Sequence, residues 1–235
     1  MTKYKESDMY PSIRRLLAEQ GFTVRGEVNG CDIAAVKGDT LWVVEMKLTA
    51  NLKLIYQAME RQTATDWVFI AIPRPKSARD GNFTKFQRLL KKLQLGLITV
   101  SLDSPMKHTE IILFPAGRDN KTTKKAKAVH REIAGRTVDT IGGTTKKIVN
   151  TAYRERCVRI ACLLEKKGAL RAQDLVKIYG CEKDASKILM TNYFGWFNRI
   201  STGLYELSHI GTEYLKNNAS SSLIIYYRMK TENIL

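Results

Sequence analysis

Three ionisable residues in the first quarter of the chain have types and spacing that could support phosphate chemistry. The stretch GCDIAAVKGDTLWVVEMK contains two short apolar runs separated by the turn sequence KGDT. Asp32 precedes the first run, Glu45 ends the second, and Lys47 follows two residues later. A hairpin turn centred between Gly38 and Asp39 places Asp32 directly opposite Glu45, with Cβ atoms about 4.5–5.5 Å apart. Strand alternation puts Lys47 on the same face.

Two carboxylates in direct opposition call for a cation, because like charges that face each other destabilise a sheet. A divalent metal ion between Asp32 and Glu45 would supply it, and so would Lys47. The alternative is an ordinary hairpin whose charged ends are solvated. The four cysteines and three histidines of the chain have no metal-ligand spacing, so carboxylates would have to bind any metal, which favours Mg²⁺ or Mn²⁺.

The elements around this hairpin form an α/β pattern. Apolar spacing up to Pro115 predicts a helix, three strands, a helix, a strand, a helix and two strands. The predicted helices are ESDMYPSIRRLLAEQGF, NLKLIYQAMERQTA and FTKFQRLLKKLQLG. The strand WVFIAIP is apolar throughout, which is typical of a strand buried on both faces. We therefore expect a mixed β-sheet flanked by helices.

The remainder of the chain predicts a second, smaller domain. Residues 1–117 hold the α/β pattern, and residues 118–150 are rich in Lys, Arg, Thr and Gly, which indicates a basic linker with at most one short helix. Residues 151–216 contain three helical segments, TAYRERCVRIACLLEKKG, ALRAQDLVKIYG and EKDASKILMTNYFGWFNRI, and then a β-ribbon, STGLYELSHIGTEYL. This order indicates a winged helix-turn-helix domain. Residues 217–235 stay unassigned.

The charge of the chain points to a polyanionic partner. Thirty-nine Lys and Arg against 23 Asp and Glu give a net charge of +16, which favours nucleic acid first and an anionic membrane surface second. General solubility is the alternative reading of the same excess. The third predicted helix carries four aromatic residues that could stack on bases or fill the core of the domain. The lysines expected to contact nucleic acid are Lys121, Lys124, Lys125, Lys146, Lys147, Lys183 and Lys187.

No run of apolar residues approaches the length of a membrane span, and the N-terminal segment MTKYKESDMY has no apolar signal core. We therefore expect a cytoplasmic protein with no membrane partner. The sequence does not decide between a monomer and a homodimer.

The order helix, three-stranded meander, helix, strand resembles the PD-(D/E)XK nuclease superfamily, because an Asp begins the second strand and a Glu-x-Lys ends the third. The resemblance implies a restriction-endonuclease-like sheet in which Asp32 and Glu45 bind Mg²⁺ and Lys47 orients or helps to deprotonate the attacking water. It also implies a role for Gln57, which lies on the following helix where many members have a glutamine. One departure is Cys31, where the motif has proline.

Further site candidates are Glu6 on the first helix, Glu27 on the first strand and Arg61 one turn beyond Gln57. The segments ESDMYP, GEVNGCD, VVEMK, QAMER and NYFGWFNR together are similar to a bacterial family described as putative PD-(D/E)XK phosphodiesterases. This likeness implies a Mg²⁺-dependent DNA endonuclease that a C-terminal winged helix targets to double-stranded DNA. The alternative is a catalytically silent nuclease fold that binds nucleic acid or regulates another protein.

Overall fold

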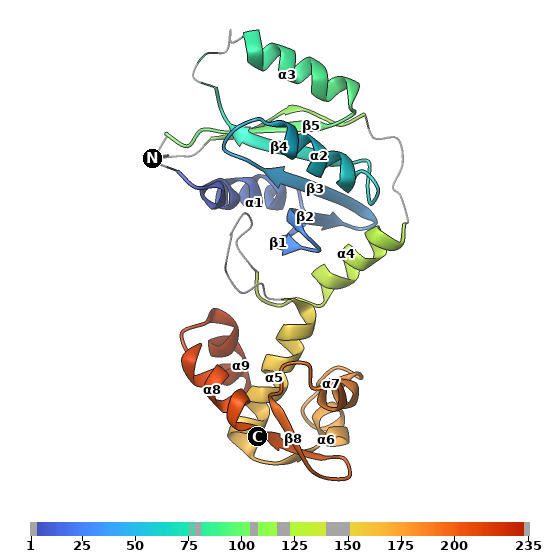
Figure 1. Ribbon diagram of the computed structural model, residues 1–235, viewed down its shortest axis with the longest axis vertical. Coiled ribbons are helices and arrows are strands. Elements are labelled where there is room, and N and C mark those ends of the chain that lie inside the picture. Colours follow the sequence, from blue (N-terminus) through green and yellow to red (C-terminus); the bar gives the residue numbers. More distant parts are fainter. Residues whose placement is uncertain are drawn as a thin grey trace. The chain divides into compact units, whose positions relative to one another are not determined.

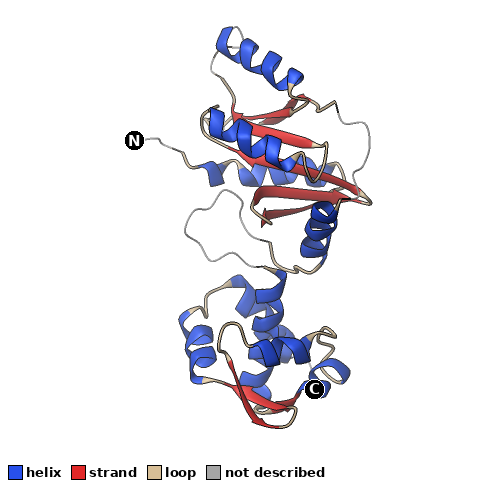
Figure 2. Cartoon of the chain, turned by 45° about the vertical axis from the view of Figure 1, so that its right-hand side comes forward, coloured by secondary structure: helices blue, strands red, loops and turns tan. Residues whose placement is uncertain are grey.

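A computed structural model describes residues 4–75, 77, 81–103, 108–116, 123–139 and 151–232. The chain divides into two compact units, Met1–Val149 and Asn150–Leu235, each with its own sheet (Figures 1 and 2). Within the described ranges, no helix is both long and apolar enough to cross a membrane.

The first unit is built on a six-stranded mixed sheet, as the sequence predicts. Its strands follow chain order, with antiparallel pairing except for the parallel pairs β3–β4 and β4–β5. The strands are β1 (Thr23–Val28), β2 (Cys31–Lys37), β3 (Thr40–Met46), β4 (Val68–Pro73), β5 (Gly96–Val100) and β6 (Thr109–Leu113). The first five residues of β4 are all buried, which confirms the prediction of a strand covered on both faces.

Helices cover both faces of this sheet (Figure 1). The described helices of the unit are the 3-10 helix η1 (Glu6–Asp8), α1 (Tyr10–Glu19), α2 (Leu52–Arg61), α3 (Gly81–Lys92) and α4 (Lys124–Ala134). Helix α1 buries Ile13 and Leu17 against Ile33 and Val44. Helices α2 and α3 pack in a separate cluster with β4 and β5. The segment predicted as the first helix thus forms two elements, the short 3-10 helix η1 followed by α1.

The register of the β2–β3 hairpin is the one that the sequence predicts. Ile33 pairs with Val44, and the pairing continues to Lys37 opposite Thr40. The turn is thus centred between Gly38 and Asp39, with Gly38 at φ +56°. This register carries Asp32 and Glu45 to opposing positions, one step beyond the Ile33–Val44 pair, at the end of the hairpin away from the turn.

The β1–β2 turn has a sequence signal of its own. Asn29 and Gly30 both have positive φ, 48° and 80°, and Val28 pairs with Cys31 across them. A two-residue turn with positive φ at both positions favours Asn-Gly, because glycine and asparagine tolerate this region best. The Asn29-Gly30 dipeptide is therefore typical of the tight turn that joins β1 to β2 shortly before Asp32.

The segment expected to be a basic linker contributes a packed helix to the first unit. Helix α4 buries Ala126, Val129 and Ile133 beside β1 and β2, and the Thr123 side chain caps its first turn. The boundary expected at residue 117 therefore falls inside this unit. The physical reason is the spacing of the three apolar residues, which forms a stripe on one helix face among many lysines.

Residues after α4 are also anchored to the sheet. The Arg136 guanidinium is 4% exposed and donates to the carbonyl oxygens of Gly26 and Glu27, at 2.9 Å each. The carboxylate of Asp139 accepts from the Gly26 backbone N–H at 3.1 Å and from the Tyr10 hydroxyl at 2.5 Å. These contacts satisfy backbone groups of β1, the strand at one edge of the sheet.

The second unit combines a short sheet of order β7–β9–β8 with five helices among its described residues. Its elements are α5 (Ala152–Lys167), β7 (Leu170–Arg171), α6 (Ala172–Lys177), α7 (Ala185–Thr191), β8 (Phe197–Ser201), β9 (Leu204–Leu207), α8 (His209–Asn217) and α9 (Ser222–Glu232). The three predicted helices correspond to α5, α6 and α7, and the predicted ribbon begins as the β8–β9 hairpin.

The third predicted helix was too long. Helix α7 ends at Thr191 because Asn192 adopts a left-handed conformation, φ 44°. The Asn192 side chain then brackets Phe197, accepting from its N–H at 3.1 Å and donating to its carbonyl oxygen at 2.7 Å. These two hydrogen bonds fix the start of β8. The aromatic cluster is divided accordingly: Trp196 is buried, as core residues are, whereas Tyr193 is 77% exposed.

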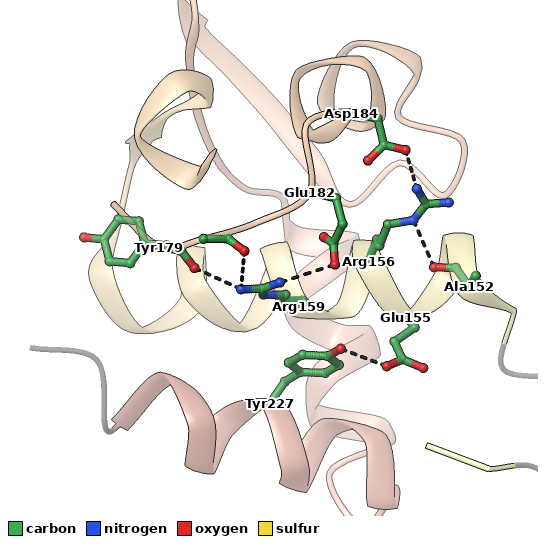
Figure 3. A network of polar contacts seen from close by, with 9 residues as sticks. Ala152, Glu155, Arg156, Arg159, Tyr179, Glu182, Asp184 and Tyr227 are labelled. Carbon is green, nitrogen blue, oxygen red and sulfur yellow. Dashed lines mark hydrogen bonds and ion pairs between the residues drawn. The ribbon is translucent and has the colours of Figure 1, made fainter. Parts of the chain in front are cut away.

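The predicted β-ribbon and tail are largely helical beyond β9. Helix α8 takes up His209 onward, and α9 lies on α5 (Figure 3). The Tyr227 hydroxyl donates to Glu155 at 2.8 Å, and Arg228 binds Glu165 through two nitrogens at 2.9 and 2.7 Å. The described part of the segment that the sequence left unassigned, residues 217–232, thus contributes Leu223, Ile224 and Tyr227 to the core of the second unit.

Candidate active site

The two opposed carboxylates lie at the end of the β2–β3 hairpin. Beyond the Ile33–Val44 pair, the Met46 N–H donates to Asp32 Oδ2 at 2.7 Å. The Glu45 side chain is only 1% exposed, and its Oε1 accepts from Arg61 Nε at 2.6 Å. A strand backbone holds one carboxylate and a helical guanidinium holds the other.

The electrostatics of this pair are dominated by burial. Burial and the neighbouring charge of Asp32 raise the pKa of Glu45 to about 7, although Arg61 opposes the shift. Burial also raises the pKa of Asp32, against the opposing effects of the Met46 N–H and Lys47. The carboxyl groups are close enough to hydrogen-bond when one of them is protonated. The pair therefore retains a proton near neutral pH unless another cation compensates its charge.

Lys47 and Glu6 form the outer part of the site. Lys47 Nζ lies 2.8 Å from Glu6 Oε2, and both side chains are about one quarter exposed, at 23% and 26%. Glu6 reaches this position from η1, before α1 begins. The structure thus brings together the predicted catalytic lysine and the predicted acidic residue of the N-terminal helix.

Gln57 and Arg61 lie one turn apart on α2, so they share a face of that helix. The Asn51 side chain caps the helix by accepting from the Leu54 N–H at 2.9 Å. Arg61 donates to the carbonyl oxygen of Gly30 as well as to Glu45. The Oε1 atom of Gln57 is buried and accepts no hydrogen bond within the described part of the chain. A buried amide oxygen without a donor is an unsatisfied acceptor, which a water or substrate donor could reach after a local rearrangement.

Glu27 is placed by its backbone. It has φ 52°, and its carbonyl oxygen accepts from Arg136. It lies between Gly26, which pairs with Ile33, and Val28, which pairs with Cys31. Glu27 is therefore the neighbour of Asp32 on the adjacent strand. Its backbone is left-handed and is held in place by the hydrogen bond from Arg136.

The donor set suits a hard divalent cation with few protein ligands. Across the described ranges, no group of three or more His, Cys, Asp or Glu side chains could hold a metal ion. Half-buried Asp32 and buried Glu45 are two oxygen donors whose pKa values are raised, chiefly by burial, and Arg61 opposes the shift only at Glu45. Mg²⁺ commonly uses one or two carboxylates and keeps several waters. These two residues therefore fit Mg²⁺ or Mn²⁺, on condition that Arg61 shares or releases Glu45.

The lysines expected to contact nucleic acid fall into two groups. Lys124 and Lys125 are exposed on α4, and Lys183 and Lys187 are exposed at the start of α7 and on it. The other three, Lys121, Lys146 and Lys147, lie outside the described residues.

The sequence did not reveal that Arg61 contacts Glu45, and it did not give the position of helix α4, which lies near Arg61. The sequence places Arg61 on the Gln57 face of α2, but the contact with Glu45 depends on how α2 crosses β3. Helix α4 could have been found from Ala126, Val129 and Ile133 together with the capping residue Thr123.

Residues 98–214 match the model of a protein family described as "Putative PD-(D/E)XK phosphodiesterase (DUF2161)". This match confirms the resemblance predicted from the sequence. The matched span begins in β5 and ends in α8, so Asp32, Glu45 and Lys47 lie outside it. No curated protein and no solved structure matches the chain.

Proposed function

We propose, from the match of residues 98–214 to the family model described as "Putative PD-(D/E)XK phosphodiesterase (DUF2161)", that this chain is a Mg²⁺- or Mn²⁺-dependent nuclease that hydrolyses phosphodiester bonds of DNA. The observation that carries the proposal is the pair of half-buried Asp32 and buried Glu45, opposed on adjacent strands with Lys47 two residues beyond. Their raised pKa values support a role for a cation between them.

In this mechanism Asp32 and Glu45 hold the metal ion. When bound, the ion would lower the pKa of a coordinated water and withdraw charge from the phosphoryl oxygen. Lys47, positioned by Glu6, would donate to the attacking water or to a phosphate oxygen. Gln57 has a buried oxygen without a donor, and this oxygen would accept a hydrogen bond from the water and so orient it.

The second unit would deliver this site to double-stranded DNA. Its first six elements run helix, strand, helix, helix, strand, strand, the order that supports a winged helix-turn-helix assignment. Lys183 and Lys187 are exposed beside α7, where they could contact phosphates. The net charge of +16 supports the same partner. Each phosphate that the protein neutralises should steepen the dependence of log K on log salt by about 0.9 for duplex DNA.

One contact favours a second function. In that case the protein would be catalytically silent and would use the same fold to bind nucleic acid or to regulate another protein. Arg61 already supplies a cation to Glu45 at 2.6 Å. A protein without metal could keep this pair as a purely structural ion pair. The two functions differ in whether a divalent ion can replace that guanidinium.

Incubation of supercoiled plasmid with the full chain, with and without Mg²⁺ or Mn²⁺, tests the proposal. We expect metal-dependent nicking or linearisation that Glu45→Gln abolishes. Asp39→Asn is the matched control, because Asp39 is an exposed acid in the turn of the same hairpin. Undiminished cleavage by Glu45→Gln would remove this site from the mechanism. Plasmid binding without cleavage by the wild type under all metal conditions would favour the silent protein.

A further inference from the structure

A pocket of about 360 Å³ lies beside the carboxylate pair in the first unit. Its walls come from the β1–β2 turn with Asn29 and Cys31, the end of α2 with Arg61, and the first turns of α4 with Lys125 and Ala128. Cys31 directly precedes Asp32, and Arg61 contacts Glu45. The pocket therefore opens next to the residues proposed to cleave the phosphodiester bond. Its volume lies within the range of about 300–1,000 Å³ typical of small-molecule sites.

One cation in this pocket lacks a carboxylate partner in the described contacts. Lys125 Nζ lies 3.0 Å from the Thr63 hydroxyl, a neutral group just after the end of α2 that also lines the pocket. The hydroxyl holds the ammonium by a hydrogen bond without neutralising it. Arg61 provides a second positive group from the side of the carboxylate pair, and Glu60 provides the acidic group of the lining. An anionic group near Lys125 would gain a charge-assisted hydrogen bond.

The remaining part of the lining is mostly apolar. Cys31, Ala64, Ala128 and Val129 line it, and all except Ala128 are buried. Asn29 adds an exposed amide with both donors and an acceptor. A ligand that matches this lining has a flat or apolar body, polar edges for Asn29 and Glu60, and a phosphate for Lys125. These are the features of a nucleotide.

We propose that this pocket binds one unpaired nucleotide, with its phosphate at Lys125 and its base against Ala128 and Val129. The proposal rests on the proposed function and deepens it. The pocket holds a single nucleotide, so the substrate would be a strand with an unstacked or extruded nucleotide beside the cleaved bond. The preferred substrates would then be single strands, flaps or distorted duplexes.

Binding of thymidine 5′-monophosphate to the full chain in EDTA, measured by isothermal titration calorimetry, tests the pocket without any metal or cleavage. We expect Lys125→Ala to weaken binding about tenfold, the effect of losing one charge-assisted hydrogen bond. Lys124→Ala is the matched control, because Lys124 is an exposed neighbour on α4 outside the pocket lining. Ala128→Phe should abolish binding by filling the pocket without changing its charge.

Inorganic phosphate and thymidine complete the experiment. We expect each of them to bind at least about tenfold more weakly than the nucleotide, because each makes only part of the contacts. The assignment is overturned if the nucleotide does not bind, if phosphate binds as tightly as the nucleotide, or if Lys124→Ala and Lys125→Ala weaken binding equally. A chain that binds the nucleotide in this pattern but never cleaves DNA would refute the nuclease function and leave the pocket standing.

Discussion

The titration of Glu45 gives a direct measure of the electrostatics in the carboxylate pair. In the folded chain, burial and Asp32 raise the pKa of Glu45 to about 7, against an ordinary value of 4.5. The folded state therefore keeps a proton on Glu45 over a pH range in which the unfolded state loses it. Stability must fall as pH rises through this range, because the folded chain binds more protons than the unfolded chain.

The size of the effect follows from the same two values. Below pH 4.5 the carboxyl is protonated in both states and contributes nothing to the pH dependence. Between pH 4.5 and about 7, each pH unit lowers the free energy of unfolding by about 1.4 kcal/mol. The total loss attributable to this group is about 3 kcal/mol, and above pH 7 it is constant.

Urea denaturation in EDTA between pH 4.5 and 8 would measure this loss. Tryptophan fluorescence suits the experiment because Trp42 and Trp67 both lie in the first unit. We expect Glu45→Gln to flatten the decline relative to the wild type, since a glutamine at this position can still accept from Arg61 and cannot titrate. Asp39→Asn, which alters an exposed acid of the same hairpin, should leave the profile of the wild type unchanged.

Parallel stability profiles for the wild type and Glu45→Gln would refute the reasoning. A rise in wild-type stability confined to pH below about 5, followed by a flat profile and removed by Glu45→Gln, would be equally damaging, because it would mean that Arg61 lowers the pKa of Glu45 below its ordinary value of 4.5. Either result would imply that the carboxylate pair needs no further cation.

Two further predictions concern packing. Gly96→Ala should destabilise the first unit by about 1–3 kcal/mol in urea denaturation, because an added Cβ would lie 2.3 Å from the buried Phe69 ring; Gly81→Ala, with open space around it, should not. Tyr227→Phe should cost the second unit about 1–3 kcal/mol by removing a hydrogen bond from the buried Glu155, whereas Tyr226→Phe, at an exposed neighbour, should be neutral in thermal unfolding.

The hairpin that carries the site was predictable because its register depends on local information. Strand side chains alternate with a period of two, and the turn at Gly38 and Asp39 fixes which residues face each other. The resulting pairing from Ile33–Val44 to Lys37–Thr40 is the predicted one. The same holds for β4, whose continuous apolar run needs no partner to be recognised.

Elements failed to be predicted where the deciding signal was a single residue or a distant contact. The third helix of the second unit ends early because the Asn192 backbone is left-handed and its side chain accepts a hydrogen bond from the Phe197 N–H. The apolar residues around Asn192 nevertheless keep helical spacing, so the sequence pattern does not show this end. Helix α4 was hidden by its lysines, since only three small or branched apolar residues mark its buried face. Helix α9 buries residues against α5 through contacts more than sixty positions apart in the sequence.

The contact between Arg61 and Glu45 is one of the contacts between separate elements that the sequence pattern does not reveal. It links the proposed metal site to the proposed nucleotide pocket. Arg61 compensates Glu45, which is 1% exposed, and also lines the nucleotide pocket. A metal ion between Asp32 and Glu45 would take over the compensation of the carboxylate. Arg61 would then be free to turn its charge toward the phosphate of a bound nucleotide, beside Lys125. On this argument, metal and substrate would assist each other through one guanidinium.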